Sequence, residues 1–128
     1  MESELLSASS IKMSHKVVAY TDLTDLLIQT CSPGFIMKIK RDKHFAETMG
    51  KKMTQTGSAI ALFAPDAVVT ACLAYINAAR NEDSAPVNIL MLFSDLLLAI
   101  RRDLIPETTL TREEVVDAII KMDVLPHA

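Results

Sequence analysis

Apolar side chains recur every three or four positions along most of this chain, a spacing typical of amphipathic helices. The first periodic segment covers residues 12–30, and its apolar face consists of Val17, Tyr20, Leu23 and Leu27. Another face of this segment carries polar side chains, namely Asp22, Asp25 and Gln29. All five prolines fall between periodic segments: Pro33, Pro65, Pro86, Pro106 and Pro126. Because proline breaks a helix interior but is tolerated in a first turn, the pattern predicts helix boundaries near these positions.

The segment from residue 35 to residue 63 predicts a second helix. Its first part, FIMKIK at 35–40, alternates weakly and so could form a short strand. A lone strand would have no partner to pair with, and we therefore expect the start of a helix there. From Phe45 onward the helical spacing is clear in Phe45, Met49, Met53, Thr56, Ile60 and Phe63.

Two glycines, Gly50 and Gly57, lie inside this predicted helix. Each lowers the stability of a helix by about 1 kcal/mol relative to alanine. They indicate either a kink or the close approach of a neighbouring helix, and the sequence does not decide between these two interpretations.

Two further helices are predicted near residues 64–80 and at the C-terminal end. The first begins with a proline and an aspartate, which both suit the first turn of a helix. Ser84 is the predicted N-cap of the segment that follows. Thr111 and Glu114 have the spacing of a capping box, which predicts a last helix from there to about residue 122. The predicted buried face of this last helix consists of Val115, Ala118, Ile119 and Met122.

The stretch NILMLFSDLLLAIRRDL at 88–104 is the most apolar part of the chain. A helix needs about twenty apolar residues to cross a bilayer, and this run is too short and contains an aspartate, so we expect no membrane span. Its polar positions Asn88, Asp95 and Arg102 are seven residues apart and form one narrow stripe. A helix that is apolar on every other side is covered by its neighbours. The pattern therefore predicts the central helix of a bundle.

These elements together predict an all-α fold, namely an antiparallel four-helix-type bundle with a short fifth C-terminal helix. We expect one helical domain over residues 12–125, preceded by a flexible N-terminal segment at residues 1–11. Four helices provide limited cover for so apolar a central helix, and apolar surface left over would favour a homodimer.

Composition adds few constraints on function. The chain has 128 residues and a net charge of −3, so the whole protein has no electrostatic attraction to nucleic acid or anionic lipid. Cys31 and Cys72 have no metal-binding or redox spacing, which favours two buried thiols over a disulfide. The first ten residues lack the basic-then-apolar order of a signal peptide, so we expect a cytoplasmic protein.

The sequence has no recognisable catalytic or cofactor-binding motif. His15, His44 and His127 are scattered, without the spacing of a metal site. Neither of the glycine-rich loops that bind phosphates or dinucleotides occurs. We therefore expect no enzyme, no metal and no cofactor.

Six of the thirteen lysines and arginines fall between residues 38 and 52. A run of this kind is usually a solvated helix face, although it could also follow a phosphate backbone. No helix-turn-helix pattern or aromatic platform accompanies it. The candidate nucleic-acid-binding residues are Lys38, Lys40, Arg41, Lys43, Lys51 and Lys52.

Asp95, Arg101 and Arg102 are the other polar residues of interest, because they lie on the most apolar segment. An aspartate on a mostly buried helix usually has a hydrogen-bonding or cationic partner. We expect a structural ion pair here, with a role at a partner surface as the alternative.

Parts of the chain resemble small uncharacterised bacterial helical proteins. The resemblance lies in ALFAPDAVVTACLAYINAAR, in LMLFSDLLLAIRRDLIPETTLTREEVVDAI and in the early AYTDLTDLL, and it covers residues 19–27 and 59–120. It implies a helical bundle and brings no known activity. Small proteins of this kind are often carried on mobile elements, so the resemblance implies such a genomic setting.

Three hypotheses of function follow from these patterns. The first is a non-enzymatic helical interaction or adaptor module that self-associates, with a homodimer or another protein as its partner. The second is a nucleic-acid-binding accessory protein that uses the basic segment 38–52. The third is a binder of small ligands with a pocket lined by Met49, Met53 and Met91.

Overall fold

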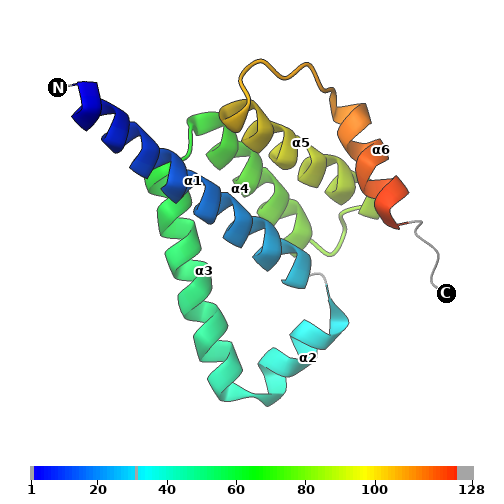
Figure 1. The fold of residues 1–128 in the computed structure, drawn as a ribbon. Helices are drawn as coiled ribbons and strands as arrows, with labels where there is room; N and C mark the ends of the chain where they lie inside the picture. The colour runs from blue at the N-terminus through cyan, green and yellow to red at the C-terminus, as the bar shows by residue number, and fades with distance from the viewer. Residues whose placement is uncertain (1, 31, 124–128) are drawn as a thin grey trace. The chain divides into compact units, whose positions relative to one another are not determined.

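A computed structural model describes the backbone of residues 2–30 and 32–123 and the side chains of residues 13–30 and 32–122. Within these ranges the chain forms helices and no strand (Figure 1). The helices are α1 (Glu2–Thr30), α2 (Pro33–Arg41), α3 (Lys43–Phe63), α4 (Asp66–Arg80), α5 (Pro86–Leu104) and α6 (Arg112–Asp123). The predicted all-α fold is therefore confirmed, and residues 35–40 are helical as expected.

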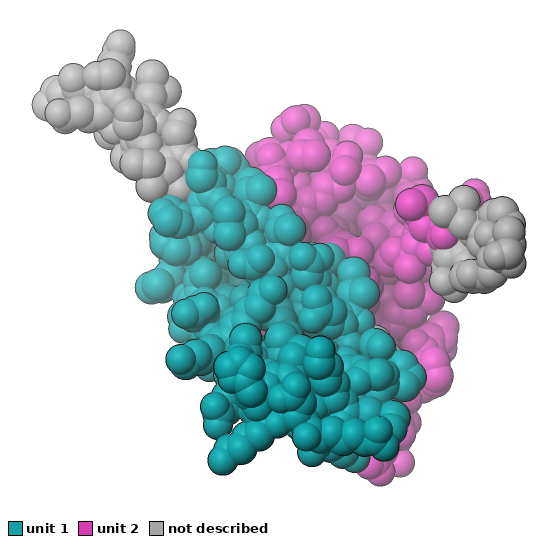
Figure 2. All heavy atoms as spheres, turned by 60° about the horizontal axis from the view of Figure 1, so that its bottom comes forward, with its two compact units in different colours: residues 1–64 teal, residues 65–128 magenta. Residues whose placement is uncertain are grey.

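The chain divides into two compact units, residues 1–64 and residues 65–128 (Figure 2). Unit 1 contains α1 to α3, and unit 2 contains α4 to α6. In each unit one helix has the most extensive contacts with the other two: α3 in unit 1, where α1 and α2 also touch, and α5 in unit 2. One domain over residues 12–125, built as a four-helix-type bundle, stays a prediction.

The predicted helix over residues 35–63 is two helices, because the chain breaks at Asp42. Asp42 ends α2 and is also the N-cap of α3, and its backbone is extended. Its side-chain Oδ1 accepts a hydrogen bond from the backbone N–H of Phe45 at 3.0 Å. Aspartate at this position satisfies one of the free N–H groups of a new helix. The cap separates the two helices in a region where the apolar periodicity alone predicts one.

Helix α1 begins at Glu2, so the helix start predicted near residue 12 is too late. The flexibility predicted for residues 1–11 stays a prediction. Three of the four residues of the predicted apolar face are buried, whereas Val17 is exposed. Among the described side chains of α1, residues 13–30, the buried ones are Ala19, Tyr20, Leu23, Leu26 and Leu27.

The glycines of α3 do not mark a close helix contact. A Cβ atom added to Gly50 or Gly57 would meet no atom within 4 Å, apart from the local backbone. The interpretation that these glycines let a neighbouring helix come close is therefore wrong. The buried side chains of α3 are Met49, Thr56 and Ile60, all from the predicted apolar face.

Helix α5 is buried on two opposite faces. Ser94 and Leu98 lie one turn apart on one face, and Leu96 and Ile100 lie one turn apart on the other. No residue from 89 to 100 is exposed, while Asn88 and Arg102 are. The hydroxyl of Ser94 donates to the carbonyl oxygen of Leu90 at 2.9 Å, so its burial leaves no unpaired polar group. The prediction that this helix is mostly covered is confirmed, whereas its place at the centre of a single bundle stays a prediction.

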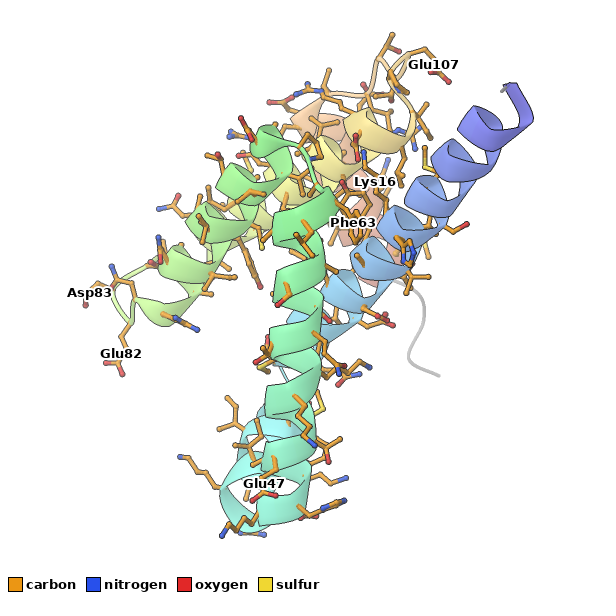
Figure 3. The ribbon with its side chains drawn as sticks, turned by 90° about the vertical axis from the view of Figure 1, so that its left-hand side faces the viewer. Lys16, Glu47, Phe63, Glu82, Asp83 and Glu107 are labelled. Atoms are coloured by element: carbon orange, nitrogen blue, oxygen red, sulfur yellow. The ribbon has the colours of Figure 1, made fainter. Side chains whose placement is uncertain are left out.

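The core of unit 2 forms where α4 packs on α5. Helix α4 contributes Val68, Cys72 and Tyr75, and the ring of Tyr75 lies 5.4 Å from that of Phe93. The loop between the two helices carries Glu82 and Asp83, both exposed (Figure 3). Each large side chain buried here stabilises the fold by about 1.5–3 kcal/mol.

The ends of α5 and α6 confirm one predicted cap and correct another. The N-cap of α5 is Ala85, so the prediction of Ser84 as the cap is wrong, and the proline in the first turn begins the helix. At α6 the capping box is present: the Glu114 N–H donates to Thr111 Oγ1 at 3.3 Å, and the Thr111 N–H donates to Glu114 Oε1 at 3.2 Å.

The predicted buried face of α6 is partly wrong. Ala118 and Met122 are exposed, and Met122 retains 69% of its accessible surface. Val115 and Ile119 are half-buried. Helix α6 packs mainly on α5, which leaves much of its surface uncovered.

Among the helices that the structure describes, none is both long and apolar enough to cross a membrane.

Candidate functional site

Unit 1 contains a groove between α1 and α3 with a volume of about 630 Å³. This size falls within the range of about 300–1,000 Å³ that is usual for small-molecule sites. Residues of α1 and α3 alone line it: His15, Val18, Ala19, Asp22, Thr48, Lys51, Lys52, Gln55, Thr56, Ala59 and Phe63.

Helical spacing explains why these residues share one groove. Counted from His15, the α1 residues fall at positions i, i+3, i+4 and i+7, and the α3 residues repeat this spacing from Thr48 onward. Such positions lie along a single face of each helix. Ala19 and Ala59 have short side chains, which leave space between the two helices.

An aromatic pair closes one end of the groove. Phe63 lies at the C-terminal end of α3 (Figure 3), and its ring stacks on the ring of His15 from α1. The ring centroids are 5.3 Å apart and the planes differ by 6°. His15 is exposed and Phe63 is half-buried. The stacked rings therefore give this end of the groove an aromatic surface that a ligand can reach from solvent.

The other end of the groove carries charge. Lys51 is exposed, Lys52 is half-buried, and Asp22 lies on the α1 side. The salt bridges found among the described residues involve neither lysine. Lys52 and Phe63 are separated by about 17 Å along α3, at about 1.5 Å per residue. The groove therefore has cations toward one end and an aromatic surface at the other.

The structure brings only part of the predicted basic cluster to this groove. Lys51 and Lys52 line it, whereas the other four candidates lie on α2 and at the start of α3: Lys38, Lys40, Arg41 and Lys43. All six except Lys52 are exposed. The Nζ atom of Lys38 lies 4.4 Å from the centre of the Phe45 ring, a cation–π contact within unit 1.

Sequence reasoning missed the aromatic part of this site. No aromatic platform was expected beside the basic residues, yet His15 and Phe63 line the same groove as Lys51 and Lys52. The two rings come from different helices, so no local pattern could pair them. The methionines proposed as a pocket, Met49, Met53 and Met91, do not line this groove.

In unit 2, Asp95 forms a bidentate ion pair with Arg112 across α5 and α6. The Nε atom of Arg112 donates to Asp95 Oδ1 at 2.6 Å, and its second nitrogen donates to Oδ2 at 2.7 Å. These bonds and the nearby negative charge raise the pKa of Arg112 above its ordinary value. The pair ties the start of α6 to the middle of α5, because each residue comes from a different helix.

Arg101 and Arg102 have roles other than pairing with Asp95. Arg101 Nε donates to Thr108 Oγ1 at 2.8 Å and so holds the loop between α5 and α6. Arg102 is exposed. Cations at the end of α5 also suit the negative end of its dipole. A role of these residues at a partner surface stays a prediction.

The remaining nucleophilic and metal-ligating candidates provide no second site. Cys31 and His127 lie outside the described residues. Cys72 is a free, buried thiol, and burial raises its pKa. A thiol with a raised pKa is a poor nucleophile at neutral pH. Among the described residues no three histidine, cysteine or carboxylate side chains come together in a way that could hold a metal ion.

Comparison of the chain with protein-family models, with curated proteins and with solved structures found no match. The resemblance to small bacterial helical proteins therefore stays a prediction.

Proposed function

We propose that this protein is a non-enzymatic helical interaction module that self-associates. The observation that supports the proposal is the number of large apolar side chains left exposed in unit 1. They occur on all three of its helices: Met13, Val17, Val18, Ile28, Ile36, Met37, Met53 and Leu62. Apolar side chains that gather on one surface are typical of protein interfaces.

Helix α1 carries a continuous stripe of such side chains. Met13 and Val17 lie one turn apart, and Ile28 lies on the same side further along. Thr21 and Thr24 lie between them, and each hydroxyl donates at 2.8 Å to a carbonyl oxygen one turn earlier in its own helix. Because these hydroxyls are already bonded, the stripe needs no polar partner. A second helix of the same kind fits this surface.

The free energy of association comes from burying this stripe. Each large aliphatic side chain removed from water stabilises a complex by about 1.5–3 kcal/mol. Several of them are needed, because association also costs translational and rotational freedom. A symmetric homodimer uses the same stripe twice, and so doubles the apolar area that one copy contributes. The proposal includes a bacterial, cytoplasmic setting and no cofactor, as expected from the sequence.

Sedimentation velocity over a range of protein concentrations tests the proposal. The wild-type chain should shift from monomer to dimer as concentration rises, and Val17→Asp should stay monomeric because the dimer would bury an unpaired charge. Gln29→Asp is the matched control, since it places the same charge on a different, exposed face of α1. A wild-type chain that is monomeric at every concentration would overturn the proposal, as would equal behaviour of the two variants with circular dichroism showing both folded.

A second candidate function is that of a nucleic-acid accessory protein. The exposure of five of the six candidate cations supports it, because solvated lysines and arginines can release counterions from a phosphate backbone. Fluorescence anisotropy with labelled single-stranded and duplex DNA tests it. Binding should weaken steeply with added salt, and both Lys40→Gln/Lys43→Gln and Lys51→Gln/Lys52→Gln should weaken it. Absence of binding at low salt would remove this candidate.

A further inference from the structure

We propose that the groove between α1 and α3 binds a small amphipathic organic anion, with one negatively charged head and an unbranched apolar tail. The inference goes beyond self-association, because none of the stripe residues Met13, Val17 and Ile28 lines the groove. It also differs from the second candidate function, because the proposed ligand is a small molecule and not a nucleic acid.

The head of the ligand would lie against Lys51 and Lys52. Neither lysine takes part in a salt bridge among the described residues, so both ammonium groups are available to an anion. Charge-assisted hydrogen bonds from lysine to a carboxylate are stronger than neutral ones. Gln55 lines the same part of α3, and its side-chain amide adds a donor for the second oxygen of a carboxylate.

Asp22 limits the charge that the groove accepts. It lies on the α1 side, opposite the lysines, and is half-buried. Its carboxylate repels an anionic head from α1 and so favours a head placed on α3. The groove therefore holds two cations and one fixed anion, which suits a monoanion better than a chain of phosphates.

The tail would extend from the lysines toward Phe63. Val18, Ala19 and Ala59 form the apolar lining between these ends, and their small side chains leave a narrow channel. The axial separation of Lys52 and Phe63, about 17 Å, suits an extended chain rather than a compact ring system. The His15–Phe63 pair would contact the end of the tail.

Isothermal titration calorimetry of the full chain with decanoate tests the proposal. Decyltrimethylammonium and decanol, which have the same tail, should bind more weakly than decanoate, because only decanoate supplies a negative head. All titrations stay below the concentration at which the ligands form micelles. Equal affinity for decanoate and decyltrimethylammonium would overturn the proposal.

Two charge variants separate the groove from general electrostatic attraction. Lys51→Gln/Lys52→Gln should lower the affinity for decanoate by about tenfold. Lys40→Gln/Lys43→Gln removes the same charge outside the groove and should leave the affinity unchanged. If both pairs lower the affinity equally, the anion is attracted by the basic surface as a whole and the proposal is wrong.

Two size variants test the tail channel. Ala59→Phe fills the groove and should abolish binding of decanoate and decanol alike, whereas Ala61→Phe places the same ring at an exposed position that does not line it. Circular dichroism melting curves establish that each variant folds. Decanoate binding to Ala59→Phe at wild-type affinity would overturn the proposal.

The test is independent of the proposed self-association. Val17→Asp should block the dimer and leave decanoate binding intact, because residue 17 does not line the groove. The variant Lys51→Gln/Lys52→Gln should lose affinity for decanoate but should still form the dimer in sedimentation velocity. Displacement of bound decanoate by a short single-stranded oligonucleotide would instead assign the groove to nucleic acid and overturn the inference.

Discussion

Helices α3 and α5 occupy equivalent positions in their units, yet they are buried to very different extents. Each is the helix of its unit with the most extensive contacts to the other two. In α5, no residue between positions 89 and 100 is exposed. In α3, only Met49, Thr56 and Ile60 are buried, and most other residues are exposed. A central position in the topology therefore does not by itself produce a buried helix.

The difference follows from composition. Helix α5 has leucine, isoleucine, methionine and phenylalanine around most of its circumference, so burial on two faces is favourable. Helix α3 has lysines, threonines and two glycines, and only one face is apolar. Both units have a core, but unit 1 takes most of its buried side chains from α1, whereas unit 2 buries its middle helix α5. We expect α5 to contribute mainly to stability and the exposed surface of α3 mainly to binding.

Leu96→Ala should have the largest effect on stability. Leu96 is 1% exposed, and its truncation would leave a cavity in the core beside α5, which lowers the free energy of unfolding by about 2–5 kcal/mol. Leu73→Ala is the matched control in the same unit, because Leu73 is exposed and its loss should change stability by less than about 0.5 kcal/mol. Urea unfolding followed by circular dichroism measures both. Similar costs for the two variants would contradict the contrast between core and surface.

Gly50→Ala and Gly57→Ala should stabilise the chain by about 1 kcal/mol each. An added Cβ meets no atom within 4 Å at either position, so nothing offsets the gain in helix propensity. The same urea titration measures the gain, and Gly34→Ala serves as a comparison in α2, where the new Cβ would meet Ser32 Oγ at 3.7 Å. A loss of stability in the α3 variants would show that these glycines meet a neighbour after all.

Asp95→Asn should destabilise unit 2 by less than Leu96→Ala does. The variant removes a bidentate ion pair that joins α5 and α6, and this pair is partly exposed, so added salt should weaken its contribution. Asp117→Asn is the control, because its contact with Lys121 is 3.9 Å long and highly exposed. Thermal melting at low and high salt measures both. Equal, salt-independent effects would contradict a specific tie between the two helices.

The smallest effect concerns Cys72 and appears only at alkaline pH. An unfolded cysteine has a pKa of about 8.5, and burial raises the pKa of Cys72 in the folded chain. As pH rises above about 8.5, the unfolded state loses this proton before the folded state, so the free energy of unfolding should fall. Urea titrations from about pH 7 to about pH 10 measure the fall. Cys72→Ser should reduce it, and an unchanged pH profile in that variant would contradict the assignment.

The groove and the ion pair show what sequence reasoning could not reach. Asp95 was expected to have a cationic partner, but the identity of Arg112 depends on how α6 turns back along α5. The stacking of His15 on Phe63 likewise requires α1 and α3 to lie side by side. By contrast, the break between α2 and α3 could have been predicted from the sequence, because Asp42 is an N-cap aspartate and capping is a local feature.

The sequence by itself determined the helical fold, the buried character of α5 and the capping box at Thr111 and Glu114. These features depend on spacing within one segment, where side chains three or four positions apart are neighbours whatever the rest of the chain does. Only the tertiary structure decided which faces of α1 and α6 are buried and which residues form the groove. Those outcomes depend on contacts between helices, and one helix face is buried only if a neighbour lies against it.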